Sequence, residues 1–288
     1  MLKTPTPNLI RSAQMRSERK DLGETATWEY SSSQENPPLL LVHGFRGDHH
    51  GLEAIAGAMP DFRIFIPDLP GYGKTNPLES KHSLENYAKW LIELYKGLPE
   101  GTAVLGHSFG SLVVAKALEL GLEANSVVLL NPITTRANDQ NDFANRLARW
   151  FYKITQSTGA LGSAALRSPV IVRGMSIVMA TTKNLRLRSF IHSQHARFFS
   201  SYIIDRVAWE GFEAASSANV LDYTSAINAR LLLIAGDLDK IAPLSGQIRL
   251  QSELADSRLE VIERVGHLTH YETPEQVASL VREFLVKG

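Results

Sequence analysis

The hydrophobic and polar positions of this chain alternate between short apolar runs and longer amphipathic stretches. Six runs are rich in apolar residues and bounded by turn residues, and we interpret them as strands buried on both faces. These runs cover residues 37–45, 62–71, 102–108, 126–132, 229–237 and 258–266. Stretches with helical spacing lie between them, for example residues 83–98 and 109–121. The pattern therefore predicts buried strands that alternate with helices.

Strands and helices that alternate along a chain form a parallel sheet covered by helices. We therefore expect the α/β fold class, with a mostly parallel central sheet and helices on both faces. Residues 10–32 predict one or two further strands at the edge of that sheet. The last helix is marked by Thr273 as N-cap, Pro274 at its first position and Gln276 three residues after the cap.

The alternation stops between about residues 134 and 222, where three amphipathic helical patterns appear and no strand is indicated. A segment of this length is too long for a bare loop in a compact domain, so it predicts a helical insertion. The expected organisation is a core of residues 1–133 and 223–288 with a helical cap of residues 134–222. The cap carries 11 basic and 6 acidic residues, which fits either an acidic substrate or a solvated helix face.

Composition excludes several classes of partner and chemistry. The chain has 288 residues, with 30 basic and 30 acidic side chains, so no global field attracts nucleic acid or an anionic membrane. It contains no cysteine, which excludes disulfides, thiolate catalysis and cysteine-bound metals. No segment approaches the roughly 18 apolar residues of a membrane span, and the first residues lack the apolar stretch of a secretory signal. The expected location is cytoplasmic.

One short motif carries candidate chemistry. Residues 106–110 read GHSFG and fit the pattern G-x-S-x-G between an apolar strand and a helix. The glycines allow a tight turn that exposes the hydroxyl of Ser108, and the helix N-terminus offers N–H groups to developing negative charge. Ser108 is therefore the candidate nucleophile, a role that requires a base and an orienting carboxylate.

Two later strand ends provide these partners. The string LLLIAGDLDKIAP places Asp237 and Asp239 just after an apolar run, and VIERVGHLTHYETPEQ places His267 just after another. On the residues alone, either aspartate fits the role of the acid. The chain order is serine, aspartate, histidine.

These motifs resemble the α/β-hydrolase superfamily, in particular the capped group related to bacterial esterases, lipases and C–C bond hydrolases. The resemblance covers roughly residues 25–288. The family pattern G-x-x-D-x-x-x-P implies Asp239 as the acid and leaves Asp237 as a turn residue. The family-like string GHLTHYETPE implies His267 as the base, with His270 nearby as a packing or hydrogen-bonding residue.

The resemblance also implies an oxyanion hole formed by two backbone N–H groups. They belong to Phe109, which follows the nucleophile, and to Phe45, which follows His43 and Gly44. The side chains of both phenylalanines are then free to line the acyl pocket. His43 is expected to support this loop, and Arg46 is expected either to contact a substrate carboxylate or to face solvent.

Aromatic side chains of the insertion are expected to form an apolar cover over the site. The candidate pocket residues are His43, Arg46, Trp150, Phe198, Trp209 and His270. No cofactor is expected, because the glycine-rich loops match neither a Walker motif nor the full G-x-G-x-x-G spacing. No metal is expected either, because the histidine pairs lack the spacing and the carboxylate of a zinc helix. These pairs are His49 with His50 and His192 with His195.

The expected function is hydrolysis of a carboxylic ester of a small or medium apolar substrate through an acyl-enzyme. Three alternatives stay open on the same fold: a C–C bond hydrolase, an aminopeptidase that holds an amine with Glu210 and Glu213, and a small-ligand-binding protein without turnover. The expected partner is a small molecule rather than nucleic acid. The sequence does not indicate an oligomeric state.

Overall fold

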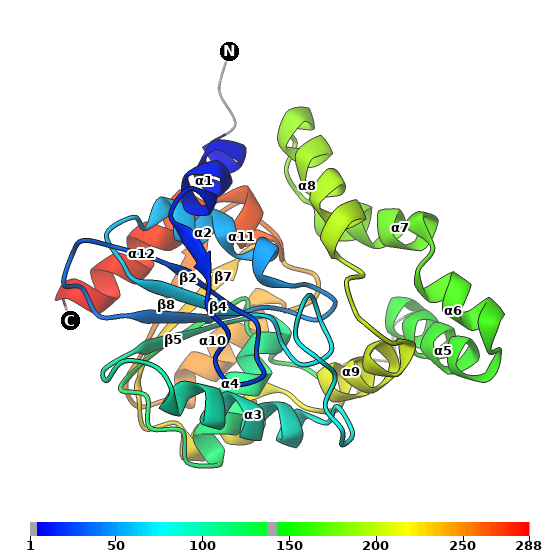
Figure 1. Cartoon of the computed structure of the whole chain (residues 1–288), viewed down its shortest axis with the longest axis horizontal. Helices are drawn as coiled ribbons and strands as arrows, with labels where there is room; N and C mark the ends of the chain where they lie inside the picture. Colours follow the sequence, from blue (N-terminus) through cyan, green and yellow to red (C-terminus); the bar gives the residue numbers. More distant parts are fainter. Residues whose placement is uncertain (1–4, 137–142, 288) are drawn as a thin grey trace.

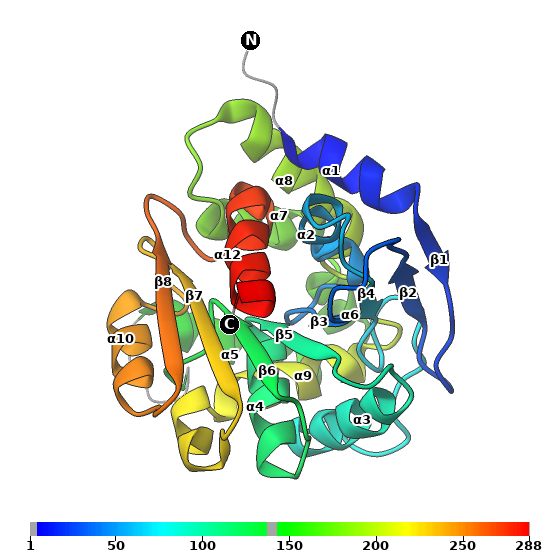
Figure 2. The same cartoon turned by 90° about the vertical axis from the view of Figure 1, so that its left-hand side faces the viewer.

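The central feature is a single mixed sheet with helices on both sides. The computed structural model describes residues 5–136 and 143–287. Within them, eight strands form one sheet in the order β1-β2-β4-β3-β5-β6-β7-β8, which Figure 2 shows from β8 at one edge to β1 at the other. The strands from β3 to β8 pair in parallel, whereas the pairs β1–β2 and β2–β4 are antiparallel. The predicted fold class is confirmed.

All six predicted strands are present, with shorter bounds. They are β3 (Leu39–Val42), β4 (Ile64–Pro67), β5 (Ala103–His107), β6 (Ser126–Leu130), β7 (Arg230–Gly236) and β8 (Ser257–Ile262). The edge strands predicted in residues 10–32 are β1 (Ser17–Arg19) and β2 (Thr27–Tyr30). The expectation that every apolar run is buried is wrong for β8. Only Ile262 of that strand is buried, because β8 is an edge strand with a neighbour on one side alone.

The buried strands divide the core into two layers. In β3, Leu39 and Leu41 belong to one cluster of buried side chains, whereas Leu40 and Val42 belong to the other, as the two-residue period of a strand requires. The first cluster includes residues of α1 (Pro5–Gln14), α2 (Glu53–Ala58) and α12 (Pro274–Lys287). The second includes residues of α3 (Leu84–Lys96), α4 (Phe109–Glu119) and α10 (Leu244–Ser252). Helices therefore cover both faces (Figure 1).

Between β6 and the 3-10 helix η2 (Val220–Ala226), which precedes β7, the described chain forms five α-helices, where three helical patterns were predicted. They are α5 (Phe143–Ser157), α6 (Ala160–Leu166), α7 (Pro169–Met179), α8 (Leu185–Phe198) and α9 (Asp205–Ser217). A glycine and a proline mark two of the boundaries between these helices. Gly159 has a positive φ of 55°, and Pro169 occupies the first turn of α7. We call residues 143–217 the helical insertion; in Figure 1 it lies beside the sheet.

The helical insertion is joined to the core by a short backbone pairing. Tyr72 and Tyr202 form an isolated antiparallel bridge, and the N–H of Ile203 donates to the carbonyl of Gly71 at 2.9 Å. Gly71 has a φ of 87°, and a Cβ at this position would lie 2.5 Å from a methyl carbon of Val207. The loop after β4 therefore needs glycine here to approach α9. None of the described helices is both long and apolar enough to cross a membrane.

Candidate active site

The candidate site lies at the carboxyl edge of the sheet. Ser108 directly follows β5, and Asn131 directly follows β6. Asp239 follows β7 after a short turn, and His267 follows β8 in the same way. Ligands bind at this edge in open parallel sheets, since the loops after the strands meet there. The fold therefore brings together the residues that the sequence analysis selected from distant segments.

Ser108 occupies a strained turn. Its φ is 53° and its ψ is −118°, a backbone conformation that costs energy for any residue with a side chain. A Cβ at Gly106 would lie 2.5 Å from the carbonyl oxygen of Gly110, and a Cβ at Gly110 would lie 2.3 Å from that of Val42. Only glycine fits at either position, so the motif allows the sharp change from β5 to α4 that presents the Ser108 hydroxyl.

Two hydrogen bonds connect Ser108 to a carboxylate. The Oγ of Ser108 lies 2.8 Å from Nε2 of His267. The Nδ1 of the same ring lies 2.7 Å from Oδ2 of Asp239. His267 and Asp239 are both buried. This geometry can pass a proton from the hydroxyl to the imidazole while the carboxylate fixes the tautomer and stabilises the resulting positive charge.

The surroundings of Asp239 keep its carboxyl group ionised. Its Oδ1 accepts the N–H groups of Ile241 at 2.8 Å and Ala242 at 2.9 Å, and its Oδ2 accepts the amide of Asn131 at 2.8 Å. Burial raises the pKa of Asp239, but the charge of His267, its hydrogen bond and these N–H groups outweigh burial and hold the pKa below its ordinary value. The carboxylate is therefore negative at neutral pH.

Asp237, the alternative acid, has a different environment. Its Oδ1 accepts the N–H of Val265 at 3.2 Å, and it makes no hydrogen bond to His267 within the described chain. This contact joins the turn after β7 to the turn after β8. Asp237 therefore has the position of a turn residue, as the family pattern implies.

Phe45 and Phe109 reach the site from two sides of Ser108. Phe109 is the first residue of α4, and Phe45 lies in the turn after β3, where Gly44 approaches Ser108 so closely that an added Cβ would lie 3.3 Å from its Cβ. Neither backbone N–H donates to a described residue. Both groups are therefore available to a negative oxygen next to Ser108.

His43 supports the turn that carries Phe45. Its Nε2 accepts the N–H of Leu69 at 3.0 Å, so the ring proton lies on Nδ1, which donates to the carbonyl of Gly44 at 2.9 Å. Burial lowers the pKa of His43, so the ring is neutral at neutral pH. His43 also lines the cavity described below.

Two further histidines surround His267 without being paired to carboxylates. The ring centroids of His107 and His270 are 4.2 Å apart, and Nε2 of His107 lies 3.3 Å from the carbonyl oxygen of His267. Burial, followed by the charge of His267, lowers the pKa of His107 to about 3. Burial also lowers the pKa of His270 well below its ordinary value, and its Nδ1 has no partner in the described chain. Both rings are neutral at neutral pH.

A cavity of about 310 Å³ opens beside Ser108 and His267. Most of the side chains that line it are apolar, and they come from both the core and the helical insertion. They include Phe45, Phe109, Ile133, Phe198, Phe199 and Phe212. From α7 and α8 the sequence analysis selected only Phe198 and missed four other lining residues, which are Met175, Met179, Gln194 and His195. The four-residue spacing of the methionines, which places them on one helix face, was the available signal.

Of the three aromatic residues predicted for the pocket, only Phe198 lines the cavity. Trp150 is 61% exposed and is not among the residues that line the cavity. Trp209 does not line it either: its Nε1 donates to the Oγ1 of Thr155 at 3.3 Å, and its ring packs against the core. Helical spacing alone did not distinguish the inner face of each helix from the outer one.

The expectation that Arg46 faces solvent is wrong, and Arg46 is not among the residues that line the cavity. Its side chain is fully buried and joins the turn after β3 to the helical insertion. Nη1 donates to the hydroxyl of Tyr152 at 3.0 Å, and Nη2 donates to the carbonyl of Leu166 at 2.8 Å and to Oγ of Ser200 at 2.6 Å. Arg46, which directly follows Phe45, therefore anchors the helical insertion to the turn after β3.

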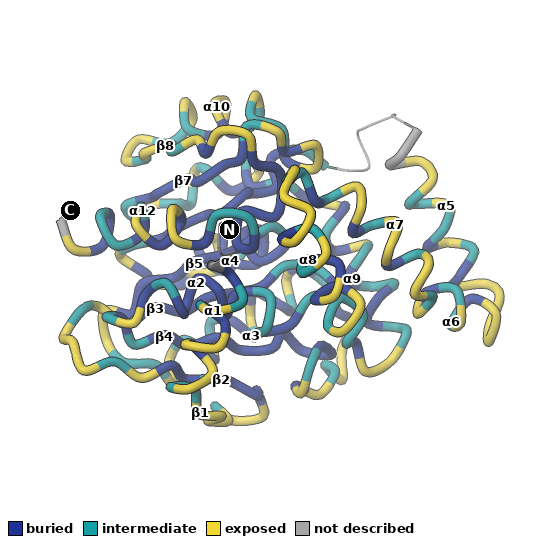
Figure 3. Tube along the Cα trace, turned by 90° about the horizontal axis from the view of Figure 1, so that it is seen from above, coloured by how far each residue is buried: buried dark blue, intermediate teal, exposed yellow. Residues whose placement is uncertain are grey.

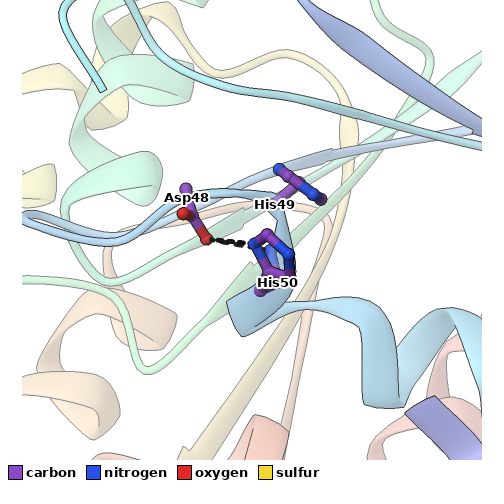
Figure 4. Close-up of side chains that lie close together, drawn as sticks. All are labelled: Asp48, His49 and His50. Carbon is purple, nitrogen blue, oxygen red and sulfur yellow. Dashed lines mark hydrogen bonds and ion pairs between the residues drawn. The ribbon is translucent and has the colours of Figure 1, made fainter. Parts of the chain in front are cut away.

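One cluster tests the expectation that no metal is bound. The ligand atoms of Asp48, His49 and His50 lie within 4.8 Å of one another, and Figure 4 shows them at the start of a short helix, with Asp48 bonded to His50. Nδ1 of His49 is bonded to Asp68 at 2.8 Å. The two rings are 3.9 Å apart, and the outer face of His50 stacks on Phe198 at 3.8 Å. Each ring is therefore bonded to a carboxylate through Nδ1 and stacked on a neighbouring ring, which gives the cluster hydrogen-bonding and packing roles; the expectation that no metal is bound stays a prediction.

Known proteins are similar to this chain in sequence and in fold. A model described as the Alpha/beta hydrolase family matches residues 39–280. Lipase 3 of Moraxella sp. (strain TA144) is 32% identical over 113 residues, which span 38% of this chain and only 36% of that protein. The 2-hydroxymuconate semialdehyde hydrolase of Pseudomonas sp. (strain CF600) is 24% identical over 87% of each chain. The structure of a thermophilic esterase from Thermogutta terrifontis superposes with a TM-score of 0.74 and 21% identity, covering 94% of this chain and 98% of that one.

Proposed function

Since the family match covers most of its length, the chain belongs to the alpha/beta hydrolase family, and we propose that it hydrolyses carboxylic esters of small or medium apolar substrates. The observation that carries this proposal is the pair of hydrogen bonds that runs from the Ser108 hydroxyl through His267 to Asp239. The names of the lipase and esterase relatives support the same bond type.

In the first half of the reaction, Ser108 is acylated. Its Oγ attacks the ester carbonyl carbon while its proton passes to Nε2 of His267, whose positive charge Asp239 stabilises. The negative oxygen of the tetrahedral intermediate accepts the N–H groups of Phe45 and Phe109. His267 then gives its proton to the leaving alcohol oxygen, the C–O bond breaks, and the acyl group remains on Ser108.

In the second half, water removes the acyl group. His267 accepts a proton from the water as its oxygen attacks the acyl carbon, and the same two N–H groups bind the second negative oxygen. When this intermediate collapses, His267 returns the proton to Oγ of Ser108. The products are a carboxylic acid and the free enzyme, so each cycle consumes one ester and one water.

The cavity supports an apolar acyl or alcohol group of modest size. Its volume of about 310 Å³ lies at the small end of the range for ligand pockets. Two of the histidines that line it, His107 and His270, are neutral because burial lowers their pKa values. We therefore propose that these histidines contribute shape and hydrogen bonds to the cavity rather than charge.

The structure weakens one alternative and leaves two open. Glu210 is bonded to His82 at 2.7 Å and Glu213 is paired with Lys81 at 2.9 Å, and neither lines the cavity. An amine-holding pair for an aminopeptidase therefore has no support. A C–C bond hydrolase remains the second candidate, because a relative is named 2-hydroxymuconate semialdehyde hydrolase and the same three side chains serve that chemistry. A binding protein without turnover is the third.

We further propose that residues 134–222 act as a cap over a core of residues 1–133 and 223–288. Side chains of α7 and α8 form one wall of the cavity, and Arg46 ties the insertion to the core. The cap then shapes the substrate site, while the groups that act on the scissile bond belong to the core. The cytoplasmic location stays a prediction from sequence.

The test of this function is covalent labelling combined with turnover. A fluorophosphonate should add one phosphonyl group to the Oγ of Ser108 with loss of fluoride, and Ser108→Ala should abolish the adduct in intact-mass analysis. A series of p-nitrophenyl esters should be hydrolysed with release of p-nitrophenol. The control is Ser111→Ala, since Ser111 lies one helical turn further on and its Oγ donates to the carbonyl of Ser108 at 2.6 Å; this variant should still be labelled.

Different failures lead to different conclusions. A wild-type protein without an adduct would contradict the role of Ser108 as nucleophile. An adduct with no ester turnover would favour the C–C hydrolase or the binding protein. Turnover of a vinylogous 1,5-diketone acid, with no turnover of simple esters, would identify the C–C reaction.

A further inference from the structure

The charge of this protein is unevenly distributed along the chain. Residues 143–204 contain nine basic residues and no acidic residue, although the whole chain has 30 of each. The nine are Arg146, Arg149, Lys153, Arg167, Arg173, Lys183, Arg186, Arg188 and Arg197. This segment forms α5 to α8, which carry an excess of basic residues although one of them, Arg167, is paired with Asp205 at 2.9 Å.

Exposed apolar side chains are gathered on the same part. Helix α7 presents Val170, Ile177 and Val178 to solvent, with exposures of 78%, 58% and 68%. These positions lie on one face of the helix, and Arg173 is exposed among them. Large apolar side chains that share one exposed face mark an interaction site.

The opposite face of α7 is apolar too. Met175 and Met179 line the cavity, and Val172 is buried. A helix that carries large apolar side chains on opposite faces normally buries both of them in a protein core or in a lipid phase. Helix α7 is buried on one side only, as the exposed stretches of the helical insertion in Figure 3 illustrate, so its outer face lacks an apolar partner within the described chain.

The start of α8, which follows α7 after five residues, also exposes apolar and basic side chains. Leu185 is 76% exposed, and Lys183 and Arg186 are exposed beside it. Helices α7 and α8 are held together by the hydroxyl of Ser176, which lies 2.6 Å from Nδ1 of His192. We call Val170, Arg173, Ile177, Val178, Leu185 and Arg186 the α7 face.

We propose that the α7 face docks on the surface of an anionic lipid bilayer. Apolar side chains can enter the boundary between headgroups and acyl chains, while the surrounding arginines and lysines bind anionic headgroups. Docking of this kind is peripheral and needs no membrane-spanning segment. It does not depend on the proposed hydrolase activity.

The combination of charge and apolar surface favours a bilayer over two other occupants. Nucleic acid would satisfy the positive charge through its phosphates but would leave Val170, Ile177 and Val178 without an apolar partner. A second copy of this chain in a symmetric contact would place the same face on both sides of the interface. Two segments with nine basic residues each and no acidic residue would then repel each other.

The position of the α7 face also relates docking to the cavity. Met175 and Met179 extend into the cavity from the side of α7 that is opposite to Ile177. A helix is about 10 Å across, so a docked bilayer would lie about one helix diameter from the cavity. On the proposed function, this arrangement suits substrates that partition into lipid.

The experiment is sedimentation of the full chain with vesicles, which reads binding and not activity. Phosphatidylcholine vesicles that contain phosphatidylglycerol should bind the protein at low salt at least about tenfold more tightly than phosphatidylcholine alone, and high salt should weaken binding. Arg173→Glu with Arg186→Glu should lower the affinity by at least about 25-fold, because each basic side chain near an anionic surface contributes roughly fivefold. Ile177→Ser with Val178→Ser should also lower it at least about tenfold.

Matched controls separate docking from general effects of charge or hydrophobicity. Ile248→Ser removes an apolar side chain of similar exposure, 55%, from α10, and Lys96→Glu reverses a charge on α3; both should bind like wild type. Ser108→Ala should also bind like wild type, which distinguishes this proposal from the proposed function. All variants are checked by circular dichroism for retained folding.

Three results would overturn the proposal. One is the absence of binding to anionic vesicles at low salt. Another is an equal loss of binding in the α7-face variants and in the controls. The third is a dimer in analytical ultracentrifugation that Ile177→Ser with Val178→Ser dissociates, together with no vesicle binding, because the α7 face would then belong to a second copy of the chain.

Discussion

The core and the helical insertion each place a serine hydroxyl against a histidine ring, and the two sites are built differently. In the core, Ser108 lies 2.8 Å from His267 at a strained turn that borders the cavity. In the insertion, Ser176 lies in the middle of α7, fully buried, 2.6 Å from His192 and 2.8 Å from His195. A short serine–histidine contact is therefore not by itself evidence of a nucleophile.

The carboxylate is the main chemical difference between the two sites. Asp239 lies 2.7 Å from the His267 ring and has a pKa below its ordinary value, so it can stabilise a positive imidazole. No carboxylate is hydrogen-bonded to His192 or His195 in the described residues, and burial, followed by the charge of His192, lowers the pKa of His195 to about 4. A ring of this kind resists protonation and cannot hold a proton taken from a serine. The comparison assigns chemistry to the core and shape to the insertion.

The largest expected effect tests this assignment with two matched serine substitutions. Ser108→Ala should lower kcat for ester hydrolysis on the order of 10⁶-fold, as removal of a triad nucleophile does elsewhere. Ser176→Ala should leave kcat within about threefold and should lower the free energy of unfolding by about 1–3 kcal/mol, since two buried imidazoles lose a partner. The measurements are steady-state kinetics and urea unfolding. A comparable loss of kcat in Ser176→Ala at equal folding would refute the comparison.

The second-largest expected effect distinguishes the roles of Asp239 and Asp237, the two aspartates in the loop after β7. Asp239→Asn should give a folded protein with turnover reduced on the order of 10⁴-fold at neutral pH, because the amide no longer holds the correct tautomer of His267 or stabilises its charge. Asp237→Asn should keep most of its activity per folded molecule, since its contact is to the N–H of Val265. The measurement is kcat/KM, normalised by circular dichroism. A larger loss in Asp237→Asn would mean that the family pattern selected the wrong acid.

Much of the core could be predicted from sequence because its signals are local. Apolar runs such as residues 102–108 reveal strands that are buried on both faces, and the glycines around Ser108 reveal a turn that only small residues permit. The error for β8 overlooked a local signal, since Arg258 and Glu260 stand at alternate positions of this edge strand. Helix α1 was also missed. It has only ten residues, and it packs on α2, a contact between distant segments that the sequence pattern does not reveal.

The insertion shows why the pocket was harder to predict than the reacting groups. A helix carries apolar residues on its inner face and, here, on its outer face, so Trp150 and Phe198 look alike in sequence although only Phe198 lines the cavity. The role of Arg46 depends on acceptors more than 100 positions away, such as Tyr152 and Leu166. Contacts between distant segments leave no periodic signal in a single sequence.

The third prediction uses this pair of aromatic residues to test whether the insertion selects substrates. Phe198→Ala should change the ratio of kcat/KM between short-chain and longer-chain p-nitrophenyl esters by about tenfold, because it enlarges the cavity beside His50. Trp150→Ala should leave that ratio unchanged, since its ring is largely exposed. Equal chain-length profiles for wild type and Phe198→Ala would show that this wall does not select the substrate.

The smallest expected effect concerns pH and the insertion histidines, and it changes stability without changing chemistry. Between pH 6.5 and about 4, an unfolded chain binds a proton at His195, whereas the folded chain keeps the ring neutral. The unfolded state therefore binds more protons in this window, so the free energy of unfolding falls as the pH falls, by up to about 1 kcal/mol per pH unit for this ring. Its neighbour His192, whose pKa is lowered mainly by burial, acts in the same direction.

Replacing His195 should make the free energy of unfolding depend less on pH. His195→Phe keeps a ring of similar size, so its urea-unfolding free energy should decline less steeply from neutral pH to pH 5 than that of wild type. Gln194→Leu, at the adjacent position of α8, carries no titrating group and should shift stability by the same amount at every pH. A wild-type slope retained in His195→Phe would mean that the ring is already protonated in the folded state. The Ser176 site would then hold a positively charged imidazole without a carboxylate partner. Charge would no longer distinguish the Ser176 contact from the Ser108 contact.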